Sequence, residues 1–166
     1  MSPNVTLPPL PSFATARLPG LSQTMHSGEL RRTIHHMMFE ISATARFCAS
    51  HQLRLYDGSL EPLHGHDWQV KVTVAADTLD PIGVVMDFHQ LQRRVHQIID
   101  PFHNHHLNDL PSFVQVNPSA ENVGLQIGQA LKLPERVTLL AVEIWETPEN
   151  CAVVRFVDSR SLGKYH

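Results

Sequence analysis

Two stretches in which apolar and polar residues alternate constrain the fold of this 166-residue chain most strongly. In "FEISATARFCASH", residues 39–51, the odd positions are apolar until the last of them, which is His51. Residues 64–76 alternate in the same way, and His64 and His66 share a face with the tryptophan and valines that follow. Because successive side chains of a strand point to opposite faces, both stretches predict half-buried β-strands.

The apolar period changes to that of a helix in two later segments. Apolar residues from Phe88 to Ile99 fit a helical stripe that opens at Asp87, a suitable N-cap. Residues 117–134 predict a second helix, with Asn117 as its cap and a proline at its end. The stretches "VTLLAVEIWE" and "CAVVRF" then predict two strands joined by the turn "TPEN".

This order of elements predicts an α+β fold, in which two helices cover one face of a four-stranded antiparallel sheet. Such a sheet leaves its other face and both edges uncovered, which favours self-association. Residues 1–36 are rich in Pro, Ser, Thr and Leu without a clean period. We expect a poorly ordered N-terminal leader there, followed by one folded domain over residues 37–166.

Composition argues against several classes of partner. The net charge is −3 and basic doublets are few, so nucleic-acid binding has no electrostatic support. No apolar run reaches the roughly 18–20 residues that span a membrane, and the N-terminus lacks the apolar core of a secretory signal. We therefore expect a cytoplasmic protein, in which Cys48 and Cys151 are small packed residues rather than a disulfide framework.

Histidine is the unusual residue type, with 12 in the chain. A His-x-His pair on a strand puts both imidazoles on one face, so His64 and His66 suit one ion, although a solvated pair fits the same pattern. His51 ends the preceding strand on its apolar face, which makes it a candidate third ligand. Three neutral imidazoles leave one position open, as in a catalytic zinc site.

Six segments, in order, resemble the 6-pyruvoyl-tetrahydropterin synthase and 6-carboxytetrahydropterin synthase family of the tunnelling-fold group. They are "FCASH", "LHGHDWQVKV", "GVVMDF", "HLND", "NPSAEN" and "VEIWET", within about residues 38–156. The resemblance implies a zinc ion (Zn2+) bound by His51, His64 and His66, and a pterin pocket in which Glu146 binds the guanidine-like edge of the ring. It also implies subunits that close a barrel, as a homohexamer or another trimer-based oligomer, with active sites at subunit interfaces.

Three residues near the implied pterin pocket also have simpler interpretations. Glu146 shares strand parity with Leu140 and Val142, so its carboxylate is expected on the buried face, where a pterin's N–H donors would pair with it. A strand-end carboxylate that reaches solvent is the alternative. Ser119 and Glu121 match family positions near the pterin, and they equally fit a helix cap and a partner of the helix dipole.

The catalytic positions depart from the family pattern. Where the family has a cysteine this chain has Leu60, and the positions of an Asp-His dyad hold His103 and Asn104. A shift by one residue would bring His105 into the dyad. Glu61 begins "EPLHGH", which is similar to a subgroup with E-x-x-H-G-H, in which glutamate replaces the cysteine as general base. A polar residue of the loop is the alternative for Glu61.

That subgroup is associated with cleaving the side chain of a dihydroneopterin substrate, to leave a 6-hydroxymethyl-dihydropterin for folate synthesis. We therefore expect a zinc-dependent carbon–carbon or carbon–oxygen lyase acting on 7,8-dihydroneopterin or its triphosphate. Glu61 would be the general base, and His103 or His105 a proton relay. Two alternatives stay open. One is a 6-carboxytetrahydropterin synthase of the queuosine precursor route, or a pyruvoyl-type synthase, with a substituted catalytic group; the other is a non-catalytic pterin- or metal-binding relative.

Overall fold

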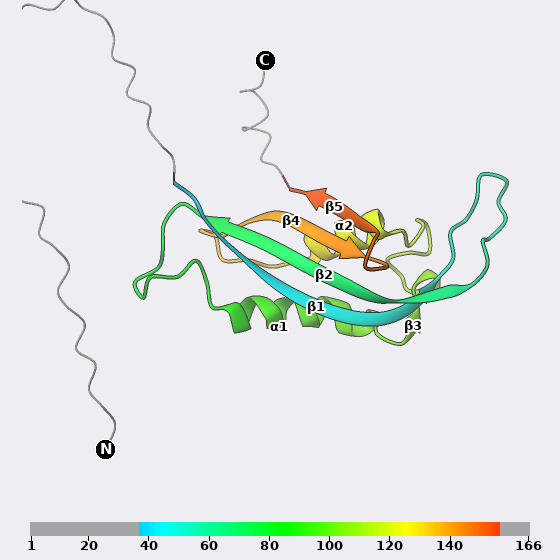
Figure 1. Cartoon of the computed structure of the whole chain (residues 1–166), viewed down its shortest axis with the longest axis horizontal. Helices are drawn as coiled ribbons and strands as arrows, with labels where there is room; N and C mark the ends of the chain where they lie inside the picture. The colour runs from blue at the N-terminus through cyan, green and yellow to red at the C-terminus, as the bar shows by residue number, and fades with distance from the viewer. Residues whose placement is uncertain (1–36, 157–166) are drawn as a thin grey trace, which may run out of the picture. The chain divides into compact units, whose positions relative to one another are not determined.

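The structure is a computed structural model that describes residues 37–156 (Figure 1). The leader predicted over residues 1–36 lies outside these residues, as do residues 157–166 of the predicted domain. Within the described part of the chain, no helix is long and apolar enough to cross a membrane.

Two long strands, β1 (Phe39–His51) and β2 (His64–Ala76), pair antiparallel along their whole length. Their bounds are those that the alternation predicts. The apolar side is buried from Ala43 to His51 in β1 and from Trp68 to Ala76 in β2, and Phe47 stacks on Trp68 with 5.7 Å between ring centroids. Cross-strand pairs of this kind stabilise the pairing of β1 with β2 and fix its register.

The sheet has five strands in the order β3-β1-β2-β4-β5 (Figure 1). As predicted, β4 (Thr138–Trp145) and β5 (Cys151–Arg155) continue the antiparallel pairing. The additional strand, β3 (His105–His106), pairs parallel to β1, so the prediction of four antiparallel strands is wrong in this respect. A strand of two residues is too short to carry an alternating pattern, and only its pairing with β1 identifies it.

Two helices pack against one face of the sheet, α1 (Phe88–Ile99) on β1 and α2 (Ala120–Ala130) on β4 and β5. Asp87 caps α1 as predicted, because its carboxylate accepts a hydrogen bond of 3.0 Å from the His89 N–H. The core between helices and sheet contains Phe47, Trp68, Val70, Val72, Leu91, Val95, Ile99, Val123, Ile127 and Ile144. Two 3-10 turns, η1 (Asp100–Phe102) and η2 (Leu107–Asp109), flank β3.

The start of α2 differs from the prediction. Its N-cap is Ser119, whose hydroxyl accepts a hydrogen bond of 3.4 Å from the Asn122 N–H. The side chain of Asn117, the predicted cap, instead binds the backbone of Arg54. An asparagine before a helix can cap it or bind another segment, and the local sequence does not distinguish the two.

A register shift in β4 changes which of its side chains reach the core. Between the partners of Thr73 and Val74, the pairing skips Leu140, which is the extra residue of a β-bulge. Leu139 packs on the core in its place, so the predicted inward face of Leu140 is wrong. Beyond the bulge the alternation resumes and leads to Glu146, just after the end of the strand.

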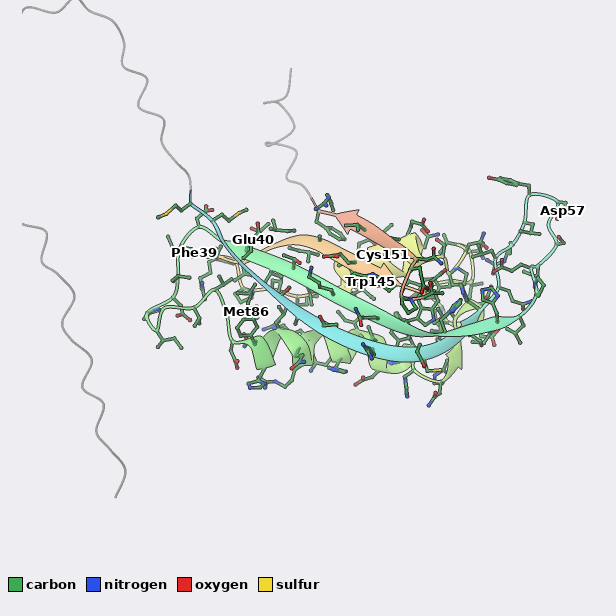
Figure 2. The ribbon with its side chains drawn as sticks, in the orientation of Figure 1. Phe39, Glu40, Asp57, Met86, Trp145 and Cys151 are labelled. Carbon is green, nitrogen blue, oxygen red and sulfur yellow. The ribbon has the colours of Figure 1, made fainter. Side chains whose placement is uncertain are left out.

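The two cysteines are exposed, so the prediction that they are packed is wrong. Cys48 lies on the outward face of β1, as its parity predicts, opposite Asp67 of β2. Cys151 begins the edge strand β5, close to Trp145 at the end of β4 (Figure 2).

Candidate active site

Three imidazoles converge where the end of β1 pairs with the beginning of β2. His51 lies opposite His64 in the register, and His66 follows two residues later on the same face. One nitrogen from each ring lies within 4.8 Å of the others. Strand pairing thus brings the three predicted metal ligands together, because residues two apart on a strand share a face.

Backbone carbonyls orient two of these rings. His51 Nδ1 lies 2.9 Å from the carbonyl oxygen of Pro118, and His64 Nδ1 lies 2.8 Å from that of Pro62. Because a carbonyl oxygen only accepts, each Nδ1 carries the proton and each Nε2 keeps its lone pair free. A carbonyl bonded to the far nitrogen is the usual support of a metal-binding histidine.

The Nε2 atom of His51 gives the strongest indication of a bound ion. His51 is only 2% exposed, and its Nε2 is buried without a hydrogen-bond partner. A buried polar atom without a partner is unfavourable, and a cation would satisfy it. Burial also lowers the pKa of His51, and the hydrogen bond with the Pro118 carbonyl opposes that effect only in part. Neutral imidazole is the form that binds a metal, so the three residues fit such an ion.

Glu61 lies beside the three histidines. One carboxylate oxygen, Oε1, is 3.7 Å from His64 Nε2, and the same oxygen accepts a hydrogen bond of 2.9 Å from the Leu53 N–H. The Glu61 N–H donates to the Leu53 carbonyl at 3.0 Å, and the Gln52 side chain donates to the Glu61 carbonyl at 2.7 Å. The loop therefore holds a carboxylate next to one of the three converging imidazoles.

A second carboxylate, that of Glu146, reaches the site from the end of β4. Its Oε1 is 3.9 Å from His51 Nε2. Burial raises the pKa of Glu146, while His66 and His64 oppose that effect. A desolvated carboxylate of this kind favours a ligand with N–H donors.

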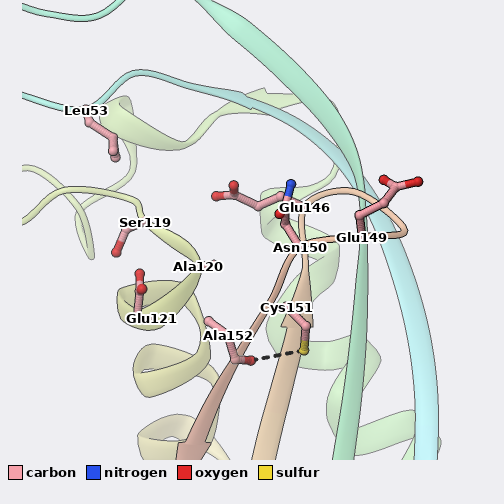
Figure 3. A pocket seen from close by; sticks show the side chains of 9 residues that line it. All are labelled: Leu53, Ser119, Ala120, Glu121, Glu146, Glu149, Asn150, Cys151 and Ala152. Atoms are coloured by element: carbon pink, nitrogen blue, oxygen red, sulfur yellow. Dashed lines mark hydrogen bonds between the residues drawn. The ribbon is translucent and has the colours of Figure 1, made fainter.

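Glu146 also lines a pocket of about 410 Å³, which lies within the range of small-molecule sites. Ser119 and Glu121 at the start of α2 form another part of its wall, and the Glu146 carboxylate points toward that side (Figure 3). Ser119 thus caps α2 and lines the pocket at once. The three predicted substrate-binding residues share one cavity.

His103 and His105 lie at the other edge of β1, around β3. His103 Nδ1 accepts a hydrogen bond of 3.1 Å from the Cys48 N–H, and His105 Nδ1 lies 2.8 Å from the His103 carbonyl oxygen. Both residues are exposed, and neither belongs to the converging group of nitrogens in the described part of the chain. The structure therefore does not bring them to the three histidines, and their role as a relay stays a prediction.

Sequence reasoning missed several residues around the site. Leu53 and Asn150 line the pocket, and Gln52 contacts Glu61. These are loop and turn residues without a periodic pattern. Asn108 binds Gln52 and falls in the segment "HLND", and Asn150 ends the predicted turn "TPEN", so these two motifs were signals that could have drawn attention to the group.

Comparison with known proteins identifies the family of this chain. A family model described as 6-pyruvoyl tetrahydropterin synthase matches residues 40–156. The 6-carboxy-5,6,7,8-tetrahydropterin synthase of Bacillus subtilis is 30% identical over 131 residues, which cover 73% of this chain and 88% of that protein. The human 6-pyruvoyl tetrahydrobiopterin synthase is 30% identical over 132 residues, which cover 70% of this chain and 90% of the human protein.

Solved structures share the fold. The Caenorhabditis elegans 6-pyruvoyl tetrahydropterin synthase superposes with a TM-score of 0.63 at 22% identity, covering 73% of this chain and 97% of that one. A Plasmodium vivax 6-pyruvoyltetrahydropterin synthase in which a catalytic glutamate is replaced by alanine gives a TM-score of 0.58 at 18% identity, covering 72% and 98%. The resemblance read from six short segments is thereby confirmed, and this chain belongs to the 6-pyruvoyl tetrahydropterin synthase family.

Proposed function

We propose that this protein is a zinc-dependent lyase that cleaves a carbon–carbon bond in the side chain of 7,8-dihydroneopterin or its triphosphate. The product would be 6-hydroxymethyl-dihydropterin, an entry to folate synthesis. The observation that carries this proposal is the Glu61 carboxylate, 3.7 Å from His64 Nε2. Glu61 directly follows Leu60, which occupies the position of the catalytic cysteine in the family pattern.

Zinc is the ion that we propose for His51, His64 and His66. Three neutral imidazoles with a free fourth position are typical of catalytic zinc. When bound, the ion would supply Lewis-acid chemistry, which makes a nearby substrate hydroxyl easier to deprotonate.

Glu146 would orient the substrate. Its carboxylate lies on the wall of the 410 Å³ pocket, and burial raises its pKa. Paired N–H donors of a pterin ring would bind its two oxygens and offset the desolvation. The same contact would hold the side chain of the substrate toward the three histidines, because Glu146 Oε1 is 3.9 Å from His51 Nε2.

Glu61 would act as the general base. It takes the proton from the hydroxyl on the second carbon of the substrate side chain, whose C–O bond becomes a carbonyl. The bond between the first and second carbons breaks, and its electron pair moves into the dihydropterin ring. A proton then returns to the first carbon, which leaves a hydroxymethyl group on the ring and releases a two-carbon hydroxyaldehyde, which carries the triphosphate when the substrate has one. The P. vivax enzyme, which has the same fold, also has a glutamate among its catalytic residues.

We further propose a trimer-based oligomer, such as a homohexamer. β3 and β5 end the sheet, and strand edges with free backbone groups favour pairing with further chains.

A second candidate is a 6-carboxytetrahydropterin synthase in which Glu61 or a histidine replaces the cysteine. It is favoured by relatives that carry this name, among them the Haemophilus influenzae protein, which is 27% identical over 133 residues.

Incubation of the zinc-loaded protein with dihydroneopterin triphosphate, followed by mass spectrometry, tests both candidates. A 6-hydroxymethyl-pterin product supports the first, and a carboxy- or pyruvoyl-pterin supports the second. Tight pterin binding without turnover would overturn both in favour of a non-catalytic relative.

Glu61→Gln tests the base itself. It should lower kcat by about 100- to 10,000-fold, because the amide cannot take the proton, while zinc content stays unchanged. Glu40→Gln is the matched control, since this exposed carboxylate lies at the far end of β1 from His51 (Figure 2). Undiminished turnover in Glu61→Gln would contradict the assignment.

A further inference from the structure

We infer that Asn108 and Asn117 are positioning residues that fix Glu61 against the three histidines. They bind one side of the extended segment 52–54, and Glu61 binds the other side. The inference rests on the proposed function, because it concerns the placement of the proposed general base.

Asn108 pairs with the backbone of Gln52 through both ends of its carboxamide. Its Oδ1 accepts a hydrogen bond of 2.9 Å from the Gln52 N–H, and its Nδ2 donates one of 2.7 Å to the Gln52 carbonyl. The side chain therefore takes the place of a neighbouring strand, whose backbone would offer one acceptor and one donor to the same residue.

Asn117 makes the same pair of bonds two residues further along. Its Oδ1 accepts from the Arg54 N–H at 2.7 Å, and its Nδ2 donates to the Arg54 carbonyl at 3.0 Å. The Arg54 guanidinium adds a bond of 3.0 Å to the Val114 carbonyl. Two asparagines thus hold alternate residues of one short segment.

The backbone of Leu53, between these two residues, faces Glu61. In an extended chain, successive backbone groups point to opposite sides, so Gln52 and Arg54 face the asparagines and Leu53 faces away from them. The Leu53 N–H donates to Glu61 Oε1 at 2.9 Å, and its carbonyl accepts from the Glu61 N–H at 3.0 Å. A displacement of the segment would therefore move the donor that holds the Glu61 carboxylate.

Both asparagines lie on segments that are themselves anchored. Asn108 follows Leu107, which is fully buried in the core. Asn117 precedes Pro118, whose carbonyl accepts the hydrogen bond from His51. By contrast, the rest of the loop extends away from the sheet, with Asp57 near its tip (Figure 2). The position of Glu61 thus depends, through the segment 52–54, on polar contacts to two asparagines that lie outside the loop.

Asn108→Ala tests the inference kinetically. We expect kcat to fall by about 10- to 100-fold, as for small displacements of a catalytic group, with KM and zinc content nearly unchanged. In a Glu61→Gln background, the same substitution should have little further effect on kcat, because the residue acts through Glu61. Wild-type kcat in Asn108→Ala, or an equal additional loss in the double variant, would overturn the inference.

Asp80→Ala is the matched control for lost stability. The Asp80 carboxylate also accepts two backbone hydrogen bonds, from Ile82 and Val84, in a loop beyond the opposite end of β2. It should keep wild-type kcat. If Asn108→Ala does not fold, Asn108→Asp serves instead, since it keeps the acceptor for the Gln52 N–H and loses the donor to the Gln52 carbonyl.

Amide exchange of Leu53, followed by NMR in the zinc-free protein, provides a readout without turnover. Exchange should become faster in Asn108→Ala and in Asn117→Ala, and stay as in the wild type in Asp80→Ala. Unchanged exchange in both asparagine variants would overturn the inference. If the wild type fails to cleave dihydroneopterin, the proposed function fails, whereas the exchange experiment still tests how the segment is held.

Discussion

The three histidines and Glu61 meet in one place, but the structure holds them by different means. His51, His64 and His66 sit on two paired strands whose apolar faces form the core. Glu61 comes from the loop between these strands, and its position depends on hydrogen bonds to Gln52 and Leu53. The three proposed metal ligands are therefore secured by the packing of two strands, and the carboxylate by a few polar contacts that single substitutions can remove.

The largest effect is expected for Phe47→Ala, which removes packing beneath the two strands that carry the histidines. Phe47 is 2% exposed and contacts Trp68 and Phe102 ring to ring, so the substitution leaves a cavity beneath the paired strands. We expect the free energy of unfolding to fall by about 3–5 kcal/mol, measured by urea denaturation. Phe39→Ala, at the exposed beginning of the same strand, is the control and should cost much less. Equal losses of stability in the two variants would show that the buried Phe47 side chain does not stabilise the paired strands β1 and β2.

The next largest effect concerns the three proposed metal ligands. His64→Ala should weaken zinc binding by more than about 100-fold, because two imidazoles remain of three. Metal analysis after dialysis measures this without reference to turnover. His89→Ala, which removes an exposed histidine at the start of α1, should keep the wild-type zinc content. If His64→Ala retained its zinc, the ion would not be bound by these three histidines.

The smallest expected effect is the pH dependence of stability in the zinc-free protein. Burial lowers the pKa of His51 below its usual value of 6.5, so the unfolded chain takes up this proton at a higher pH than the folded chain. The contribution of His51 is thus fully present above about pH 6.5 and is lost as the pH falls through the folded-state pKa.

Urea denaturation at about pH 7.5 and about pH 5.5 measures this loss. It should be smaller in His51→Gln than in the wild type, whereas His89→Ala should behave as the wild type. An undiminished pH dependence in His51→Gln would assign the effect to other groups.

Much of the fold and part of the site could be predicted because they depend on local periodicity. Alternation over residues 39–51 and 64–76 specifies both strands with their bounds. Once the strands pair, the same alternation puts His51, His64 and His66 on one face, because a strand has only two faces. The helix that Asp87 caps follows from its apolar stripe in the same way.

Other features were decided only by the tertiary structure. The sequence pattern reveals neither the two-residue strand β3 nor the bulge at Leu140, because each depends on what the neighbouring strand offers. Asn117 reads as a helix cap and in fact binds Arg54, and Glu61 finds its donor on Leu53. Hydrogen bonds between distant segments leave no period along the chain, so the sequence by itself determined the strands and the three histidines they carry. Folding alone decided how the carboxylate beside them is held.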